Sequence, residues 1–535
     1  MTIAPFLFVF LILLPVSFGQ PLRGVFINCG ANAKSTIGGL DWLPDDRYIS
    51  TGTSKTITQQ VVTPTLATVR TFPLQNNVLK KFCYEIPVDR TKKHLIRTTY
   101  YYGGINGNIN PPIFDQIVDG TLWSVVNTTE EYVNGNVSYY EGVFMPSGKN
   151  LSVCLAANTY TDSDLFISAL EIVLLWDQLY NSTDFRAYGL SLVARNSFGY
   201  DGSVIRYPKD QFNRYWEPFG LDVFPQSTSR NLAVSGIWNL PPSEIFRTRL
   251  TRSLVEPLTL LWPPFPLPSS ELYYIALYFA DERVSTSGSL RTMDITVNGV
   301  SYYSNLTVTP AGIVMFANQW PLAGITNLTL TPALGSTAGP LINAGEIFQV
   351  LPVGGKTLTR DVIAMINLKE SFRDLPADWN GDPCLPIRYS WTGVTCSEGP
   401  RIRIIALNLT SIGLSGSISP NIARLTALTS ILLGNNSLSG NIPDLGSLRG
   451  LQNLHLEDNQ LDGTIPPSLG NLSNLSEIFL QNNNLTGRVP STLTQKPGLR
   501  LRVYSWEYIL DSMNHARSVK SILNQVLELG FNEVL

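Results

Sequence analysis

One frame of residues recurs four times between Ile404 and Pro490, and it constrains the fold more than any other feature of the chain. Each copy has apolar residues at the same three positions and then a leucine, a glycine and an isoleucine or valine in register. The copies begin 24, 23 and 24 residues apart, at Ile404, Leu428, Leu451 and Leu475. A unit of this length buries its apolar face only against its neighbours, so the copies must stack into a solenoid. The open sheet of a solenoid favours binding over catalysis.

The end of the frame, as in Leu438-x-Gly440-x-Ile442-Pro443, resembles the plant-type leucine-rich repeat of cell-surface receptors. The last three copies carry an asparagine that can hydrogen-bond the buried turn backbone of adjacent coils; these are Asn436, Asn459 and Asn483. The first copy has Ile412 at that position, as expected of a terminal repeat. Four repeats are therefore predicted over residues 401–497.

Two segments before the repeats, one with Trp379 and Cys384 and one with Trp391 and Cys396, resemble the N-terminal cap of such solenoids. The resemblance implies a disulfide between Cys384 and Cys396 that closes the apolar end of the stack, within a cap at 357–400. The other cysteines, Cys29, Cys83 and Cys154, leave one thiol unassigned.

Residues 24 to about 350 have a β-rich pattern. Short apolar runs such as 272–279 and 293–297 are bounded by turns, for example Asn298-Gly299 after the second run, which is typical of antiparallel sandwiches. The stretch exceeds one ordinary sandwich, and two modules are predicted, at 24–185 and 186–352.

Paired segments in this region resemble plant malectin-like domains. They include Phe26-Ile-Asn-Cys29-Gly30, its relative Asn196-Ser-Phe198-Gly199, and Tyr100-Tyr101-Tyr102-Gly103. With the cap and repeats, the chain is identified as a member of the malectin-like leucine-rich-repeat receptor group of plants, similar to the ectodomain of symbiosis-type receptor-like kinases. The implied fold is mainly β: tandem malectin-like β-sandwiches followed by a short α/β leucine-rich-repeat solenoid with an N-terminal cap.

The resemblance implies a carbohydrate site, because malectin modules take their name from a disaccharide-binding animal lectin with an aromatic cleft. Sugar faces pack on aromatic rings while polar side chains bind the hydroxyl groups. The candidate residues here are Tyr100, Tyr101, Tyr102, Asn106 and Trp123. The plant pattern Tyr-Gly-Asn-Tyr-Asp has lost its second aromatic and its acid. Tyrosines that pack the edge of a sandwich are the alternative.

A second candidate site is the open face of the repeat sheet, where side chains between the core leucines point outward. Apolar residues stand among polar ones there, which suggests a protein-contact patch; ordinary sequence variation is the alternative. The candidate contact residues are Leu432, His455, Glu457, Glu477, Phe479 and Gln481.

Two signals point to the secretory route. An apolar run over 6–14 with small residues before Gln20 predicts a signal peptide at 1–19. Eleven N-x-Ser/Thr sequons are candidate glycosylation sites. They are Asn127, Asn136, Asn150, Asn181, Asn305, Asn327, Asn408, Asn435, Asn471, Asn474 and Asn484. We expect a secreted protein of the apoplast or cell surface. After residue 20 no run of about 18 apolar residues occurs, so no membrane span is expected in this chain, and no kinase signature is present.

Composition excludes several classes of function. The 38 basic and 41 acidic residues form no basic stripe, so nucleic acid is not an expected partner. The three histidines lie far apart, without metal-ligand spacing, so no metal site or cofactor is expected. Asp41, Asp45 and Asp46 beside Trp42 could supply a carboxylate pair of the glycosidase type, with Asp45 and Asp46 as the pair in the enzyme hypothesis; an exposed acidic turn is the alternative.

The frame is lost after Pro490, and 498–535 is predicted as a non-repeat tail. Apolar residues at helical spacing between Trp506 and Leu529 indicate either a helix that caps the solenoid or a non-homologous splice end. For the whole chain we expect a non-catalytic, receptor-like binding protein that recognises a carbohydrate, peptide or co-receptor. A wall-glycan enzyme and a secreted inhibitor of wall-degrading enzymes are the alternatives.

Overall fold

The structure is a computed structural model that describes residues 22–503 except 58–62, 75–79, 106, 108–109, 228–231, 233, 235–236, 253–255, 270, 283–290 and 400. The chain divides into two compact units. The central unit consists mainly of Ile172–Thr183 and Leu192–Val350, and the flanking unit of Phe26–Glu171, Asp184–Ser191 and residues from Leu351 onward. The flanking unit thus combines the first predicted module with the repeat region. The predicted signal peptide and the tail beyond residue 503 lie outside the described residues.

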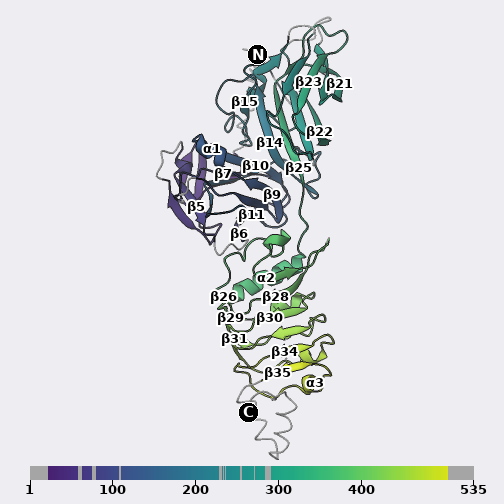
Figure 1. Cartoon of the computed structure of the whole chain (residues 1–535). Helices are drawn as coiled ribbons and strands as arrows, with labels where there is room; N and C mark the ends of the chain where they lie inside the picture. The colour runs from purple at the N-terminus through teal and green to yellow at the C-terminus, as the bar shows by residue number, and fades with distance from the viewer. Residues whose placement is uncertain are drawn as a thin grey trace, which may run out of the picture. The chain divides into compact units, whose positions relative to one another are not determined.

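The first module contains three sheets (Figure 1). One has the order β2 (Ser35–Ile37), β3 (Leu40–Pro44), β1 (Gly24–Asn28), β13 (Ala169–Leu174), β7 (His94–Tyr100), β10 (Ser138–Phe144). The second has the order β6 (Lys81–Pro87), β11 (Asn150–Ala157), β8 (Phe114–Val118), β9 (Thr121–Val126), and the third β12 (Leu165–Ile167), β5 (Thr68–Phe72), β4 (Thr53–Thr56). Between β4 and β5 lies the short helix η1 (Pro64–Leu66), and after β9 the helix α1 (Thr129–Val133). Strands such as β11 are buried along almost their whole length, as expected for a sandwich core.

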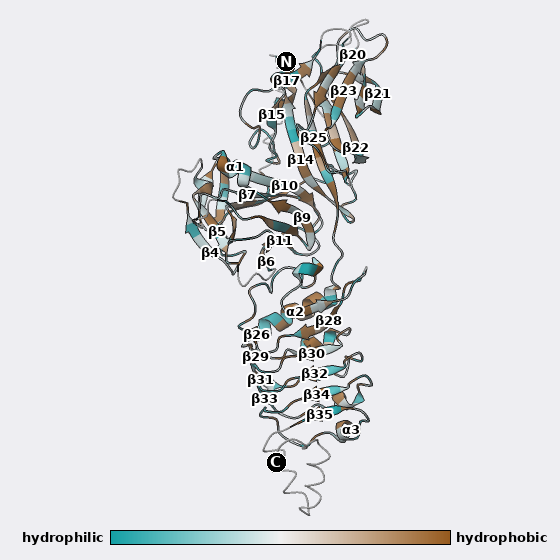
Figure 2. Cartoon of the chain, in the orientation of Figure 1, coloured by the Kyte–Doolittle hydropathy of each residue, from teal (hydrophilic) through white to brown (hydrophobic). Residues whose placement is uncertain are grey.

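The central unit repeats this topology. Its strands β25 (Ala344–Pro352), β19 (Leu272–Phe279) and β22 (Ile313–Pro321) have the order of β13, β7 and β10. A second sheet runs β18 (Leu258–Leu261), β23 (Asn327–Pro332), β20 (Arg291–Val297), β21 (Val300–Val308), and a third runs β16 (Pro225–Ser227), β17 (Thr248–Thr251), β24 (Leu341–Ile342). The remaining elements are β14 (Tyr188–Phe198), β15 (Glu217–Phe219) and η2 (Ser243–Phe246). Hydrophobic residues concentrate on the strands of these sheets (Figure 2).

The repeats form two parallel sheets. Helix α2 (Thr359–Ser371), η3 (Ile387–Tyr389), β26 (Phe372–Arg373) and β27 (Val394–Cys396) build the cap. One sheet continues from β27 through β28 (Ile404–Asn408), β30 (Ser430–Leu432), β32 (Asn453–His455), β34 (Glu477–Phe479) and β35 (Arg500–Arg502). The other sheet has the order β26, β29 (Ser415–Ser417), β31 (Ser437–Asn441), β33 (Gln460–Asp462). Three short helices come after β29, β33 and β34 in the chain, and they are η4 (Pro420–Arg424), η5 (Pro467–Asn471) and α3 (Ser491–Thr494). The sheet therefore extends through β35, into the segment where the sequence frame is lost.

The asparagines predicted to support the turns do so. Asn459 accepts a hydrogen bond from the amide of Leu438 at 2.9 Å and donates to the carbonyl of Leu433 at 3.0 Å. Asn436 and Asn483 make the equivalent bonds one repeat before and after. The ladder satisfies backbone groups that the buried turns would otherwise leave unpaired, so this prediction is confirmed.

The cysteines resolve the pairing that the sequence left open. Cys384 and Cys396 form the predicted disulfide of the cap. Cys83 on β6 and Cys154 on β11 are register partners in the first module and form a second disulfide. Cys29 is a buried free thiol.

Within the flanking unit, the cap loop packs on the sheet of β6, β11, β8 and β9. The Lys81 ammonium donates to the carbonyls of Asp382 and Leu385, at 2.5 and 2.7 Å. Asp115 on β8 accepts hydrogen bonds from Arg388 and, at 2.7 Å, from the Tyr389 hydroxyl. These contacts hold the first module and the cap as one body.

Candidate functional site

The open face of the repeat sheet presents one row of side chains from successive strands. The parallel register aligns Asn408 with Leu432, Leu432 with His455, His455 with Phe479 and Phe479 with Arg502. The residues between them, such as Leu454 and Ile478, are fully buried in the solenoid core. We call Leu432, His455, Phe479 and Arg502 the repeat strip. Its first three side chains are half-buried and Arg502 is exposed.

Contacts between neighbouring repeats hold the strip in place. The rings of His455 and Phe479 stack with their centroids 4.3 Å apart, and the Arg502 guanidinium lies 4.9 Å from the Phe479 centroid. Glu477 accepts hydrogen bonds from Arg500 at 2.6 Å and pairs with Nε2 of His455 at 3.2 Å. Desolvation opposes ionisation of Glu477, but these hydrogen bonds prevail and lower its pKa. An aromatic and charged surface held in this way needs little ordering when it binds a partner.

Two acceptor atoms lie beside the strip. Glu457 and Gln481 leave Oε2 and Oε1, respectively, buried and without a hydrogen-bond partner among the described residues. The Glu457 carboxylate lies over Gly434, where an added Cβ would come within 2.5 Å of its Oε1. Because both atoms are buried, a partner's N–H or O–H donor reaches them only when these side chains turn outward.

Of the six residues predicted for the partner surface, Leu432, His455, Glu477 and Phe479 lie on strands of this sheet, and Glu457 and Gln481 follow β32 and β34. The prediction missed Arg500 and Arg502 on β35. Both were assigned to the non-repeat tail because the segment after Pro490 lacks the glycine and proline of the frame. The signal that could have revealed them is the alternation Leu499-Arg-Leu-Arg-Val503, which is the pattern of a strand with one buried face.

The aromatic residues predicted for a sugar cleft occupy the core instead. Tyr100, Tyr101, Tyr102 and Trp123 are 1%, 7%, 2% and 3% exposed. Tyr100 packs against Phe114, Tyr140 and Phe166, and its hydroxyl donates to Gln116 at 3.1 Å. Asn106 lies outside the described residues. Because all four side chains are buried, they pack the sandwich and offer no stacking surface to a sugar.

The two candidate carboxylates, Asp45 and Asp46, both bind the guanidinium of Arg70, an arrangement that we call the arginine clamp. Asp45 is fully buried and accepts two hydrogen bonds from Arg70, at 2.9 and 2.5 Å, and one from the Tyr84 hydroxyl at 3.0 Å. Asp46 binds the same guanidinium at 2.7 Å. Two carboxylates that share one cation do not face each other across a cleft as hydrolysis requires. The interpretation as an exposed acidic turn was wrong for Asp45 and fits only Asp41 and Asp46.

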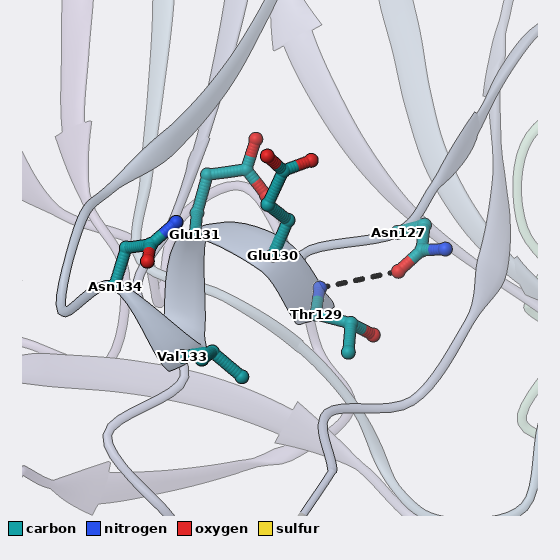
Figure 3. Close-up of a pocket in the computed structure, with 6 residues that line it drawn as sticks. All are labelled: Asn127, Thr129, Glu130, Glu131, Val133 and Asn134. Atoms are coloured by element: carbon teal, nitrogen blue, oxygen red, sulfur yellow. Dashed lines mark hydrogen bonds between the residues drawn. The ribbon is translucent and has the colours of Figure 1, made fainter.

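Other surface features do not converge on chemistry. A hollow beside α1 is lined by Asn127, Thr129, Glu130, Glu131, Val133 and Asn134. Its side chains diverge from the short helix, and the Asn127 side chain accepts from the Thr129 amide at 3.1 Å (Figure 3). In the part of the chain that the structure describes, no group of three or more histidine, cysteine or acidic residues is placed to hold a metal ion. The described helices include none that is long and apolar enough to cross a membrane.

Comparisons with known proteins agree with this architecture. The model of the malectin-like domain matches residues 27–350, that of the leucine rich repeat N-terminal domain 358–397, and that of the leucine rich repeat 450–472. The probable LRR receptor-like serine/threonine-protein kinase At1g67720 of Arabidopsis thaliana is 30% identical over 480 residues, covering 84% of this chain and 50% of the relative. The putative leucine-rich repeat receptor-like kinase At2g14440 of the same plant is 33% identical over 363 residues, covering 65% and 39%. The chain spans half or less of the length of these two relatives.

Solved structures share the fold of the malectin-like part. The ANX2 ectodomain from Arabidopsis thaliana matches with a TM-score of 0.51 and 16% identity, covering 61% of this chain and 97% of that one. A chain of the complex of plant peptide RALF23 with FER and LLG2 matches with a TM-score of 0.50 and 17% identity, covering 62% and 96%. These matches confirm the predicted mainly-β fold class. The chain therefore belongs to the malectin-like domain family, with a leucine-rich-repeat region after that domain.

Proposed function

We propose that this chain is an extracellular receptor-like protein that binds a peptide or a protein co-receptor in signalling at the plant cell surface, without catalysis and without a cofactor. The observation that carries the proposal is the repeat strip, where stacked His455 and Phe479 lie on an open sheet with the Arg502 guanidinium over the Phe479 ring. Aromatic and arginine side chains dominate the energetics of many protein interfaces. The similarity to receptor-like kinases supports the same class of function.

The acceptor atoms beside the strip refine the expected partner. Glu457 and Gln481 each lack a donor for one buried oxygen among the described residues. A partner that supplies N–H or O–H donors there gains hydrogen bonds that the free protein does not make. A peptide or protein with a lysine, arginine or amide side chain beside an apolar group fits this surface.

Two observations support an extracellular location. All eleven sequon asparagines are exposed, so each is accessible for N-glycosylation, whereas the ladder residues Asn459 and Asn483, which lie in no sequon, are buried. The two disulfides are typical of proteins that fold in oxidising compartments. Secretion through the predicted signal peptide follows as part of the proposal.

Other partners have weaker support. Burial of the tyrosines removes the predicted stacking surface for cell-wall carbohydrate, and the arginine clamp on Asp45 removes the basis for a wall-glycan enzyme. The proposal that the chain inhibits a wall-degrading enzyme is supported only by the solenoid, which the receptor-like function explains equally well. This alternative is tested by measuring the activity of a polygalacturonase with and without the chain. An inhibitor lowers the activity, whereas a receptor-like binding protein leaves it unchanged.

The strip is tested with the Phe479→Ala variant. The full chain is titrated by surface plasmon resonance against a panel of apoplastic peptides and receptor ectodomains, and for any partner bound by the parent we expect about tenfold weaker affinity in the variant. Leu334→Ser, which replaces the fully exposed Leu334 of the central unit, is the matched control and should bind like the parent. Undiminished affinity in the Leu432→Ser, Phe479→Ala double variant would place the binding site elsewhere in the chain.

A further inference from the structure

A second hollow, of about 500 Å³, lies in the central unit beside its small sheet of β16, β17 and β24. Three arginines, Arg249, Arg252 and Arg291, line it. Among the described residues no acidic side chain lines it, but the buried Asp281 pairs with Arg249 at 3.6 Å and with Arg291 at 2.8 Å. The other lining residues are Phe224, Pro225, Gln226, Thr251, Thr337, Ala338 and Gly339. We call this surface the arginine hollow.

Comparison of the two modules shows that the fold itself does not need these arginines. A Cβ added at Gly30 would meet the carbonyl of Val69, and one added at Gly199 would meet the carbonyl of Arg249. Gly30 and Gly199 end the two segments that resemble each other in the two modules. Arg249 therefore stands at the position of the central unit that corresponds to Val69 in the first module. Three residues further, Arg252 corresponds to Phe72. Val69 and Phe72 are fully buried in the core of the first module. Only the central unit therefore turns this part of the sandwich into a cationic surface.

The ion pairs around the hollow leave room for an added anion. Arg252 pairs with Glu256 at 3.1 Å, with side chains 35% and 59% exposed, and Arg249 pairs with Glu282 at 3.2 Å. The exposed pair of Arg252 and Glu256 contributes little, so a ligand carboxylate can replace Glu256 at small cost. Nε of Arg249 is buried and has no hydrogen-bond partner among the described residues. An unpaired buried donor is unfavourable unless a ligand supplies the acceptor.

Two further features indicate the kind of ligand. Phe224 is 53% exposed with a backbone φ of 42°, and its ring lies 4.0 Å from the Arg252 guanidinium, so an apolar contact adjoins the charges. β16 is an end strand of its sheet and all three of its residues are exposed. An end strand can pair with the backbone of an added peptide, which a sugar cannot do.

We propose that the arginine hollow binds an acidic peptide segment, whose carboxylate meets Arg249 and Arg252 while an apolar neighbour packs on Phe224. The proposal goes beyond the function assigned to the repeat strip and uses no residue of it. An acidic ligand pairs here with guanidinium groups, whereas the strip offers acceptors to donor groups.

The test uses the full chain and a blocked hexapeptide of alternating valine and glutamate, titrated by calorimetry at low salt. We expect saturable binding that weakens about tenfold in Arg252→Gln, since Arg252 is partly exposed and its replacement leaves the core intact. Arg206→Gln is the matched control, because Arg206 is an exposed arginine of the same unit that lies over the ring of Tyr215. It should bind like the parent, as should Phe479→Ala in the strip.

Each other result counts against the proposal. The uncharged control is a blocked hexapeptide of alternating valine and glutamine. The proposal is overturned if the parent shows no saturable binding of the glutamate peptide or if the glutamine peptide binds equally well. It is also overturned if Arg206→Gln and Arg252→Gln weaken binding to the same extent. Binding of a galacturonate oligomer without binding of the peptide would assign the hollow to an acidic glycan. Arg249→Met, with circular dichroism to verify folding, provides a second variant and should weaken peptide binding as Arg252→Gln does.

Discussion

Glu85 lies where the first module meets the cap, and its carboxylate accepts a hydrogen bond from the amide of Gly381 at 3.0 Å. Desolvation, and then the charge of Asp119, raise the pKa of Glu85 from 4.5 to about 7, while Lys369 and Lys81 act against this shift. A Cβ at Gly381 would lie 2.7 Å from Sγ of Cys83, so the cap backbone passes close to the disulfide.

The pKa of Glu85 predicts a pH dependence of folding stability. Because the folded-state value lies above the unfolded one, the contribution of Glu85 is complete below pH 4.5 and is lost as the pH rises through about 7. It amounts to at most about 3 kcal/mol. Urea denaturation between pH 4.5 and 8 should show a steeper fall in the free energy of unfolding for the parent than for Glu85→Gln. Lys81, whose pKa burial lowers from 10.5 to about 8, begins to titrate at the upper end of this range, but it is present in both proteins and so does not account for a difference between them. Parallel pH profiles would refute the assignment.

At the scale of the elements, the solenoid depends on polar groups inside its turns as much as on its leucines. The side chain of Asn459 links three carbonyls and one amide across two coils. The leucines of all four repeats form one continuous core with the cap, so a defect in one turn is felt by its neighbours.

Asn459→Ala tests the ladder. Removal of the side chain leaves the amide of Leu438 and the carbonyl of Leu433 unpaired, and we expect a loss of about 2–4 kcal/mol in the free energy of unfolding. Gln460→Ala, at an exposed neighbour on β33, should cost less than about 0.5 kcal/mol. Thermal and urea unfolding measure both. A similar loss in the two variants would show that the turn backbone finds other partners.

At the scale of the whole molecule, the division into units differs from the division of the sequence. The predicted modules follow the order of the chain, whereas the flanking unit joins the first module to the cap and repeats through Lys81, Asp115 and the residues that contact them. The partly exposed Arg388 and the buried Tyr389 both bind the buried Asp115 carboxylate. A ligand that binds the repeats is therefore held by a body that includes the first malectin-like module.

This division predicts two unfolding transitions in calorimetry rather than three. Asp115→Asn removes the charge that Arg388 and Tyr389 bind, and should lower the stability of the flanking unit by about 1–3 kcal/mol. It should also increase amide hydrogen exchange over 381–389. Asp162→Asn, at an exposed aspartate of the first module, is the control. Independent melting of the repeats and the first module in the parent would contradict the prediction.

The sequence by itself determined the features that depend on local spacing, which are the period of the repeats, the asparagine ladder and the β-rich pattern, while the family resemblance implied the cysteine pair of the cap. Only the tertiary structure decided the rest. Burial of the tyrosines, pairing of Asp45 with Arg70, the disulfide between Cys83 and Cys154 and the place of Arg502 in the strip all depend on residues distant in the chain. The physical reason is that a periodic pattern fixes which face of an element is apolar, whereas the groups that meet that face are set by how the strands pair.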